Sequence, residues 1–335
     1  MSARAATPSS TRPPLRGEER SVRRSWRQPN EPRNHAGRPR RRRLPAGRPP
    51  LPAAGHGQGC RPAGFGHGGA AKFLCPAGAL AGRPGWAALS FDYRGMGDSR
   101  RGPLKALDVD LIGWAQRDCA ALVEAARLQA PGKPLLWIGH SLGGQLPGLT
   151  PNIGRVDRIV TVAAGSGYWL ENAWPLKRRA WLFWFVFAPI LTPLFGYFPG
   201  KRLGMVGDLP AGVMRQWRRW CLHRDYAVGV EGQAVAQGFA AVRAPVLALG
   251  IEDDEMMSRR NTESLHGLYR GAAVALRRVA PAEHGLARIG HFGFFRKEHA
   301  TTLWPRLIGP ELAALEAEAP KPVESPAEAA TSALP

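Results

Sequence analysis

The chain has 335 residues, of which 44% are aliphatic or aromatic, and this is enough to bury one substantial core. Its net charge of +20 is uneven, since residues 1–84 hold 16 Arg and one Lys against three Glu. This segment therefore has a net charge of +14, and only +6 remains for the other 251 residues. The segment lacks aromatic interleaving and any recognition motif, so we expect no specific nucleic-acid partner.

The four cysteines lie far apart and form no CxxC pair, which excludes a disulfide framework and a zinc signature. The first 30 residues contain no apolar stretch that would serve as a secretory signal. Prolines at positions 8, 13 and 14 disfavour the amphipathic helix of a mitochondrial transit peptide. We therefore expect a cytoplasmic protein.

Residues 1–84 are rich in Arg, Pro, Gly and Ala and show no periodicity, so we expect this segment to be disordered. From Gly85 onward, buried strands alternate with amphipathic helices, a pattern that indicates a mostly parallel sheet covered by helices. We assign residues 85–310 to this core and residues 311–335 to a disordered tail. Strands are predicted at 85–93, 135–138, 158–164, 245–249 and 274–279, and helices at 104–130 and 294–307.

An insertion of about 80 residues interrupts the alternation between the third and fourth strands. It contains the apolar run Trp181–Phe198, which approaches the length that a bilayer requires. Pro189 and Pro193, and the globular strands on both sides, disfavour a membrane span. We therefore expect the insertion to form an apolar helical lid.

Gly139–Gly143 reads Gly-His-Ser-Leu-Gly and follows a predicted strand directly, as a nucleophile elbow does. We expect the tight turn to leave no room for side chains at Gly139 and Gly143, and to project the Ser141 hydroxyl above the sheet. The backbone N–H of Leu142 is then the expected first donor of an oxyanion hole. A helix after the elbow would point its positive end at the same site.

A serine hydroxyl needs a base, and two histidines share the loop after the fifth strand. His291 is flanked by glycines and precedes the last helix, so we favour it over His284. The acid that orients the base is expected after the fourth strand, where Glu252–Glu255 forms a run of four acids. We predict Asp254, with Asp253 as the reserve, and expect the other acids to belong to a solvated turn or helix cap.

Four strings carry a resemblance to a known family: Phe91–Ser99, Gly139–Gln145, Val162–Trp169 and Arg288–Phe295. With them, residues 85–310 resemble the α/β-hydrolase superfamily, in particular a bacterial branch related to serine aminopeptidases. The resemblance implies an α/β-hydrolase fold with a lid at about 167–239, and a triad of Ser141, His291 and one of the two aspartates. The superfamily often has Pro four residues after the acid, which neither aspartate has here.

The second oxyanion donor should come from a strand and loop that precede Gly85. Only His67-Gly68-Gly69 resembles such a loop, and no strand pattern comes before it. The Arg, Pro, Gly and Ala enrichment is what a GC-rich gene yields when it is translated out of frame. Reading codons 61–84 one base later permits a buried strand, a turn and an amphipathic helix that run into Gly85. The hypothesis that follows is a frame-shifted origin for residues 1–84.

The leading functional prediction is a serine hydrolase that cleaves a hydrophobic carboxylic ester or similar acyl bond through an acyl-enzyme on Ser141. A serine peptidase or amidase on the same triad is the first alternative. A catalytically impaired hydrolase-like protein, without the N-terminal strand and oxyanion loop, is the second. No metal or organic cofactor is implied, and the sequence does not indicate an oligomeric state.

Overall fold

The computed structural model describes residues 86–205 and 207–318, all within the unit Cys60–Pro335. The expectations for residues 1–84, including disorder, a shifted frame and the His67–Gly69 loop, lie outside the described residues. The same holds for residues 319–335 of the expected tail.

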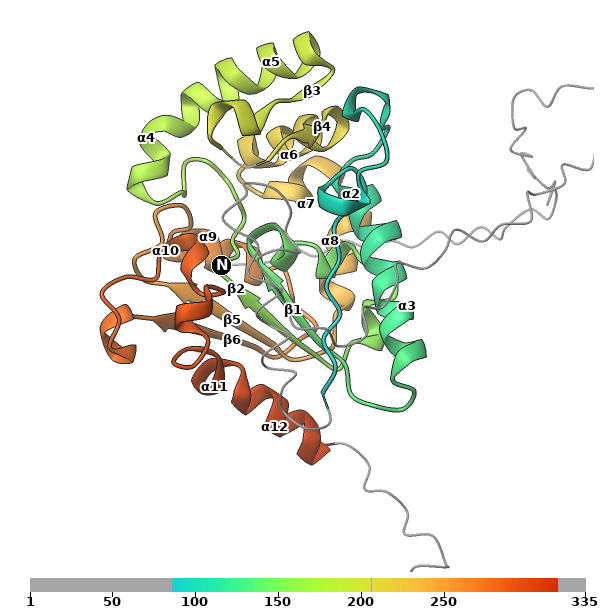
Figure 1. Ribbon diagram of the computed structural model, residues 1–335, viewed down its shortest axis with the longest axis vertical. Coiled ribbons are helices and arrows are strands. Elements are labelled where there is room, and N and C mark those ends of the chain that lie inside the picture. The colour runs from blue at the N-terminus through green and yellow to red at the C-terminus, as the bar shows by residue number, and fades with distance from the viewer. Residues whose placement is uncertain (1–85, 206, 319–335) are drawn as a thin grey trace, which may run out of the picture. The chain divides into compact units, whose positions relative to one another are not determined.

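A parallel four-stranded sheet forms the centre of the described unit, with the strand order β1-β2-β5-β6 (Figure 1). The inner strands β2 and β5 are almost entirely buried, which explains their near-continuous Val, Ile, Leu and Ala composition. All strands are parallel, so their carboxyl ends share one edge of the sheet, and Ser141 follows β1 there. The predicted α/β architecture is confirmed. The strands are β1 (Leu136–His140), β2 (Arg158–Val162), β5 (Val246–Ile251) and β6 (Val274–Val279).

Residues 86–93, predicted as part of the first strand, pair with no described strand. A strand requires a hydrogen-bonding neighbour, and no described residue provides one here. The segment is instead fixed through side chains, as where the Trp86 Nε1–H donates to Glu316 Oε1 at 2.5 Å. Consequently β1 is an outer strand of the sheet among the described residues.

The predicted helix 104–130 begins later than expected, at Leu111. The Asp110 side chain accepts a hydrogen bond from the Gly113 N–H and caps the new helix. A single 3₁₀ turn at Leu104–Ala106 precedes this cap. The helix then continues as α2 (Leu111–Gly113), a π-helical turn (Trp114–Cys119) and α3 (Ala120–Gln129).

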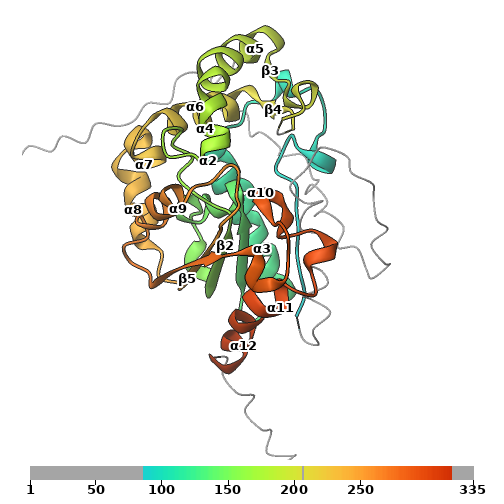
Figure 2. The same cartoon turned by 90° about the vertical axis from the view of Figure 1, so that its left-hand side faces the viewer.

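The insertion between β2 and β5 is mainly helical, and α4, α5 and α6 lie beyond the carboxyl edge of the sheet in both views (Figures 1 and 2). In the part of the chain that the structure describes, no helix is long and apolar enough to cross a membrane. The elements are α4 (Trp174–Leu182), a π-helical turn (Phe183–Phe187), α5 (Ala188–Phe195), β3 (Tyr197–Phe198), β4 (Leu209–Pro210), α6 (Ala211–Leu222), α7 (Tyr226–Glu231) and α8 (Gln233–Ala241).

The single helix predicted at 294–307 is wrong, because Arg296 adopts an extended backbone that interrupts it. Residues 311–318 are also not part of a disordered tail. They belong to a helix that buries Leu312 and Leu315 against the core. The elements after β5 are α9 (Arg259–His266), α10 (Gly290–Gly293), α11 (Trp304–Leu307) and α12 (Gly309–Glu318).

Candidate active site

Ser141 lies at the carboxyl end of β1 with a backbone φ of +49°. This left-handed conformation is costly for a residue with a side chain, and it is typical of a strained functional turn. A Cβ atom on Gly139 would collide with the carbonyl of Gly143, so the absence of a side chain is required there. The turn predicted around Ser141 is therefore present, with the serine at its apex.

Two details of the turn differ from expectation. A Cβ on Gly143 would meet only the Tyr93 hydroxyl, at an ordinary 3.7 Å, whereas a Cβ on Gly144 would lie 2.5 Å from the Ala164 side chain. The crowded glycine is therefore the third after Ser141 and not the second. The chain also continues as two 3₁₀ turns, Ser141–Gly144 and Pro147–Leu149, so the α-helix expected directly after the elbow is not formed.

A continuous hydrogen-bond chain joins the three predicted site residues. His291 Nε2 lies 3.0 Å from Ser141 Oγ, and His291 Nδ1 lies 2.8 Å from Asp254 Oδ2. Both side chains of the His291–Asp254 pair are 1% exposed. The carboxylate accepts from Nδ1–H, so the neutral ring presents the unprotonated Nε2 to the hydroxyl. This is the arrangement in which an imidazole can remove a proton from a serine.

Asp254 is itself held in place by the backbone that follows it. Its Oδ1 accepts from the N–H groups of Met256 and Met257 at 2.7 and 2.9 Å. These two hydrogen bonds fix the carboxylate rotamer that faces His291. The strand β5 ends just before this loop, which places the acid at the same sheet edge as Ser141.

The neighbouring acids contact the backbone of the histidine loop, and not the imidazole. Asp253 accepts from the N–H groups of Ile289 and Gly290 at 3.0 and 2.9 Å. Glu255 accepts from the His291 N–H at 3.1 Å. The expectation of a solvated turn is therefore wrong for these two acids. Sequence reasoning missed this contact, although a run of acids directly after a buried strand was its visible signal.

Charge and burial compete at Glu255. Burial alone would raise the pKa of its carboxyl, but the N–H groups of Glu255 and His291 and the Arg288 guanidinium outweigh it and lower that pKa. The Arg288 Nη2 lies 3.4 Å from Glu255 Oε2. The group therefore stays ionised and able to accept from the histidine backbone.

His140 contacts the same loop from the elbow side. Its Nε2 lies 2.8 Å from the His291 carbonyl oxygen, and the two rings are 5.1 Å apart. Burial lowers the pKa of His140 to about 4, and the nearby His291 adds to this effect. The neutral ring therefore donates from Nε2–H to this carbonyl oxygen. His284, the competing base, has no hydrogen-bond partner for either ring nitrogen among the described residues.

The sequence profile of the Alpha/beta hydrolase family matches residues 51–302. The chain belongs to the Alpha/beta hydrolase family. The predicted α/β-hydrolase superfamily and fold class are thus confirmed, and the family implies hydrolase chemistry.

Several solved structures resemble this alpha/beta hydrolase in fold. A soluble variant of monoglyceride lipase from Saccharomyces cerevisiae is 17% identical, with a TM-score of 0.46 over 62% of this chain and 73% of that one. A lipase-esterase related protein from Clostridium acetobutylicum is 13% identical, with a TM-score of 0.45 over 75% of this chain and 91% of that one. The meta-cleavage product hydrolase of Pseudomonas fluorescens is 14% identical, with a TM-score of 0.40 over 76% of this chain and 89% of that one. No curated protein matches the chain.

The oxyanion hole of this alpha/beta hydrolase has one predicted donor among the described residues. Leu142 directly follows the nucleophile position, so its N–H stays the predicted first donor. The predicted source of the second donor precedes Gly85, and the candidate His67–Gly69 lies outside the described residues. The second donor therefore stays unassigned.

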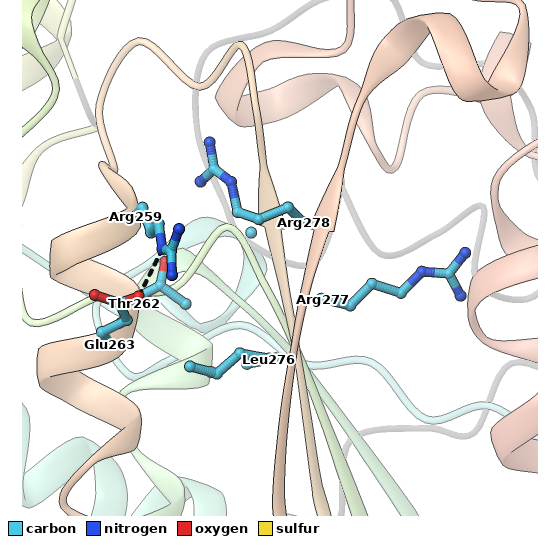
Figure 3. A pocket seen from close by; sticks show the side chains of 8 residues that line it. Arg259, Thr262, Glu263, Leu276, Arg277 and Arg278 are labelled. Carbon is cyan, nitrogen blue, oxygen red and sulfur yellow. Dashed lines mark hydrogen bonds and ion pairs between the residues drawn. The ribbon is translucent and has the colours of Figure 1, made fainter.

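A cavity of about 200 Å³ lies between α9 and β6 and contains no triad residue (Figure 3). Arg277 extends from the face of β6 opposite to Leu276 and Arg278, and a dashed line marks the Arg259–Glu263 ion pair. This cavity is not the reaction site. Among residues 86–205 and 207–318, no group of three His, Cys, Asp or Glu residues is arranged to hold a metal ion.

Proposed function

We propose that this alpha/beta hydrolase is a serine hydrolase that cleaves carboxylic esters through an acyl-enzyme on Ser141. The observation that carries the proposal is the unbroken chain Asp254–His291–Ser141, with links of 2.8 and 3.0 Å. The His291–Asp254 pair is buried, and Ser141, Asp254 and His291 follow strands β1, β5 and β6, whose carboxyl ends share one edge of the sheet. A chance cluster would not also place the serine in a left-handed turn.

In the first half of the reaction, His291 Nε2 takes the proton from Ser141 Oγ as the oxygen attacks the carbonyl carbon. The Leu142 N–H and one further donor stabilise the negative charge on the carbonyl oxygen by hydrogen bonding to it. His291 then gives its proton to the leaving alcohol, and the acyl group stays on Ser141. Asp254 stabilises the transient imidazolium through Nδ1–H.

In the second half, the same histidine removes a proton from a water molecule that attacks the acyl-enzyme. The carboxylic acid leaves, and Ser141 Oγ regains its proton. Aromatic side chains are abundant in the insertion, including Trp169, Trp184 and Phe185. This composition favours a substrate with a hydrophobic acyl or alcohol group.

The test is labelling of the full chain with a fluorophosphonate probe, followed by hydrolysis of a p-nitrophenyl ester. We expect labelling of the wild type and none of Ser141→Ala, with kcat reduced by about 10⁶. Ser99→Ala is the matched control, because Ser99 is an exposed serine in another loop. Labelling that survives in Ser141→Ala contradicts the assignment. An anilide of the same acyl group separates esterase from peptidase or amidase activity.

The impaired alternative predicts a different result, because it assumes that the Leu142 N–H is the only oxyanion donor. Losing one donor costs about 10²–10³ in rate. A folded wild-type chain that takes up the probe slowly and turns over no ester would identify an impaired enzyme with an intact base.

A further inference from the structure

Five large apolar side chains of the insertion lie exposed along one line. They are between 50% and 71% exposed, although residues of these types are normally buried. Most of the exposed large apolar side chains among the described residues belong to this insertion. We call this set the apolar stripe: Trp174, Trp181, Phe185, Ile190 and Leu194.

The helix geometry keeps the apolar stripe on one side. Residues 174–195 are helical without a break, with a π-helical turn at Phe183–Phe187 between α4 and α5. Neighbours in the stripe are seven and four residues apart, as on one face of an α-helix. Only Phe185 and Ile190 are five apart, and Phe185 itself lies in the wider π turn, Phe183–Phe187. The opposite face is buried through Ala180, Trp184, Ala188 and Thr192.

The charge beside the stripe has one sign. Residues 172–207 contain five basic residues and no Asp or Glu. None of the five forms an ion pair with a residue that the structure describes. The stripe is therefore flanked by cations whose charge is not neutralised locally. They are Lys177, Arg178, Arg179, Lys201 and Arg202.

We propose that the apolar stripe and its flanking cations form a docking surface for an anionic lipid bilayer. A helix with Trp, Phe and Leu on one side and Lys and Arg beside them binds in the interface of such a membrane. Tryptophans near helix ends, here Trp174, favour the same position. The helix rests on the surface and does not span the bilayer.

Charge argues against two other occupants. A second copy of the chain would bring the same cations against this surface, and like charges repel. Residues 1–84 carry a net charge of +14 and meet the same objection. The tail after Glu318 starts from α12, which lies at the opposite end of this unit from α5 in both views (Figures 1 and 2).

The docking surface is connected directly to the proposed active site. The Ala173 N–H, just before α4, donates to the Met256 carbonyl at 3.1 Å, in the loop that carries Asp254. The Ser258 hydroxyl donates to the Glu171 carbonyl at 2.5 Å. A docked helix therefore holds the triad loops close to the bilayer, where esters of hydrophobic alcohols and acids are concentrated. The docking itself does not depend on the triad.

The test is cosedimentation of the full chain with vesicles of phosphatidylcholine alone and of phosphatidylcholine mixed with phosphatidylglycerol. We expect binding to the mixed vesicles, and Leu194→Ser to weaken it about tenfold by removing an inserted apolar side chain. Leu128→Ser is the matched control, because Leu128 is 75% exposed on α3, against 71% for Leu194. The control should bind as the wild type does.

A charge variant tests the second component. Arg178→Gln should weaken binding to the mixed vesicles about fivefold, since one cation near an anionic surface contributes that much. Arg101→Gln, at an exposed position outside the insertion, should change nothing. Measuring all variants at high salt screens the contribution of the Arg-rich residues 1–84, and the effect of Leu194→Ser should persist there.

Three results would overturn the proposal. One is no binding to mixed vesicles, and another is an equal loss for Leu194→Ser and Leu128→Ser. The third is a dimer in solution that Leu194→Ser dissociates, without vesicle binding, which would assign the stripe to a second copy. The Ser141→Ala variant should bind vesicles normally, so failure of the docking proposal and failure of the proposed chemistry are distinguishable.

Discussion

The base side and the oxyanion side of the site are built from different parts of the chain. The base side uses the segments around Asp254 and His291. The acids of the first segment accept hydrogen bonds from the imidazole and the backbone N–H groups of the second. The oxyanion side has Leu142 and a partner expected from the chain before Gly85. A site can therefore have a fully ordered base while its ability to stabilise the oxyanion depends on a distant segment.

The largest expected effect tests the base side. Asp254→Asn should reduce kcat by about 10⁴, because an amide next to Nδ1 favours the wrong tautomer of His291. Asp253→Asn should cost only about tenfold, since it weakens two backbone hydrogen bonds and leaves the tautomer unchanged. Steady-state hydrolysis of a p-nitrophenyl ester measures both. Equal losses would mean that the two aspartates do not have separate roles.

The next effect tests the oxyanion side. If residues 61–84 derive from a shifted frame, replacing them by the alternative reading should supply the missing donor. We expect kcat to rise by about 10²–10³, the cost of one oxyanion donor. The measurement compares both chains after normalising for the folded fraction, and sequencing of the gene across these codons is its control. An unchanged kcat would mean that Leu142 alone suffices or that the donor lies elsewhere.

A smaller effect is expected where the two sides meet. His140→Phe removes the hydrogen bond to the His291 carbonyl but keeps a ring of similar shape. We expect kcat to fall about fivefold to tenfold, the value of one partly buried hydrogen bond. His140→Gln, which retains a donor, should recover most of the rate. If both variants behave like the wild type, the contact does not position the base.

The smallest effect on activity concerns pH and a second buried histidine. Burial lowers the pKa of His266 from 6.5 to about 4. Its neutral ring accepts from the Thr161 hydroxyl and donates to the Thr262 carbonyl, both at 2.7 Å. Its contribution to stability is complete above pH 6.5 and is lost as the pH falls through about 4. The loss is at most about 3 kcal/mol.

Urea unfolding at several pH values measures this loss. His266→Gln should flatten the acid side of the stability curve, while ester hydrolysis at neutral pH stays close to that of the wild type. Parallel stability curves for the variant and the wild type would show that other groups cause the acid sensitivity.

Much of the fold and the site was accessible from the sequence because it depends on local patterns. The strand Val274–Val279 was predicted with its observed bounds, and the elbow follows β1 as expected. The preference for Asp254 over Asp253 agrees with the contacts to His291, although the catalytic roles stay proposals. Each of these features is set by residues close together in the chain.

The misses depend on tertiary contacts. Whether Gly143 or Gly144 is crowded depends on the approach of Ala164, which no local pattern encodes. Asp253 and Glu255 bind the backbone of residues far along the chain, so their sequence shows only charge. Residues 86–93 have the composition of a strand, but they pair with no strand that the structure describes. The π turn at Phe183–Phe187 changes the spacing of the exposed apolar residues from four to five. The sequence therefore shows no regular helical period there, although the side chains share one face of the helix in the structure.

The left-handed backbone of Ser141 has a consequence for evolution of the chain. Glycine adopts this conformation without penalty, so Ser141→Gly should raise the melting temperature while abolishing hydrolysis. Selection for thermal stability alone would therefore favour Ser141→Gly, which gives a more stable protein with no activity. Keeping a serine at this position requires continuous selection for catalysis, and its survival in a lineage would serve as a record that the reaction was used.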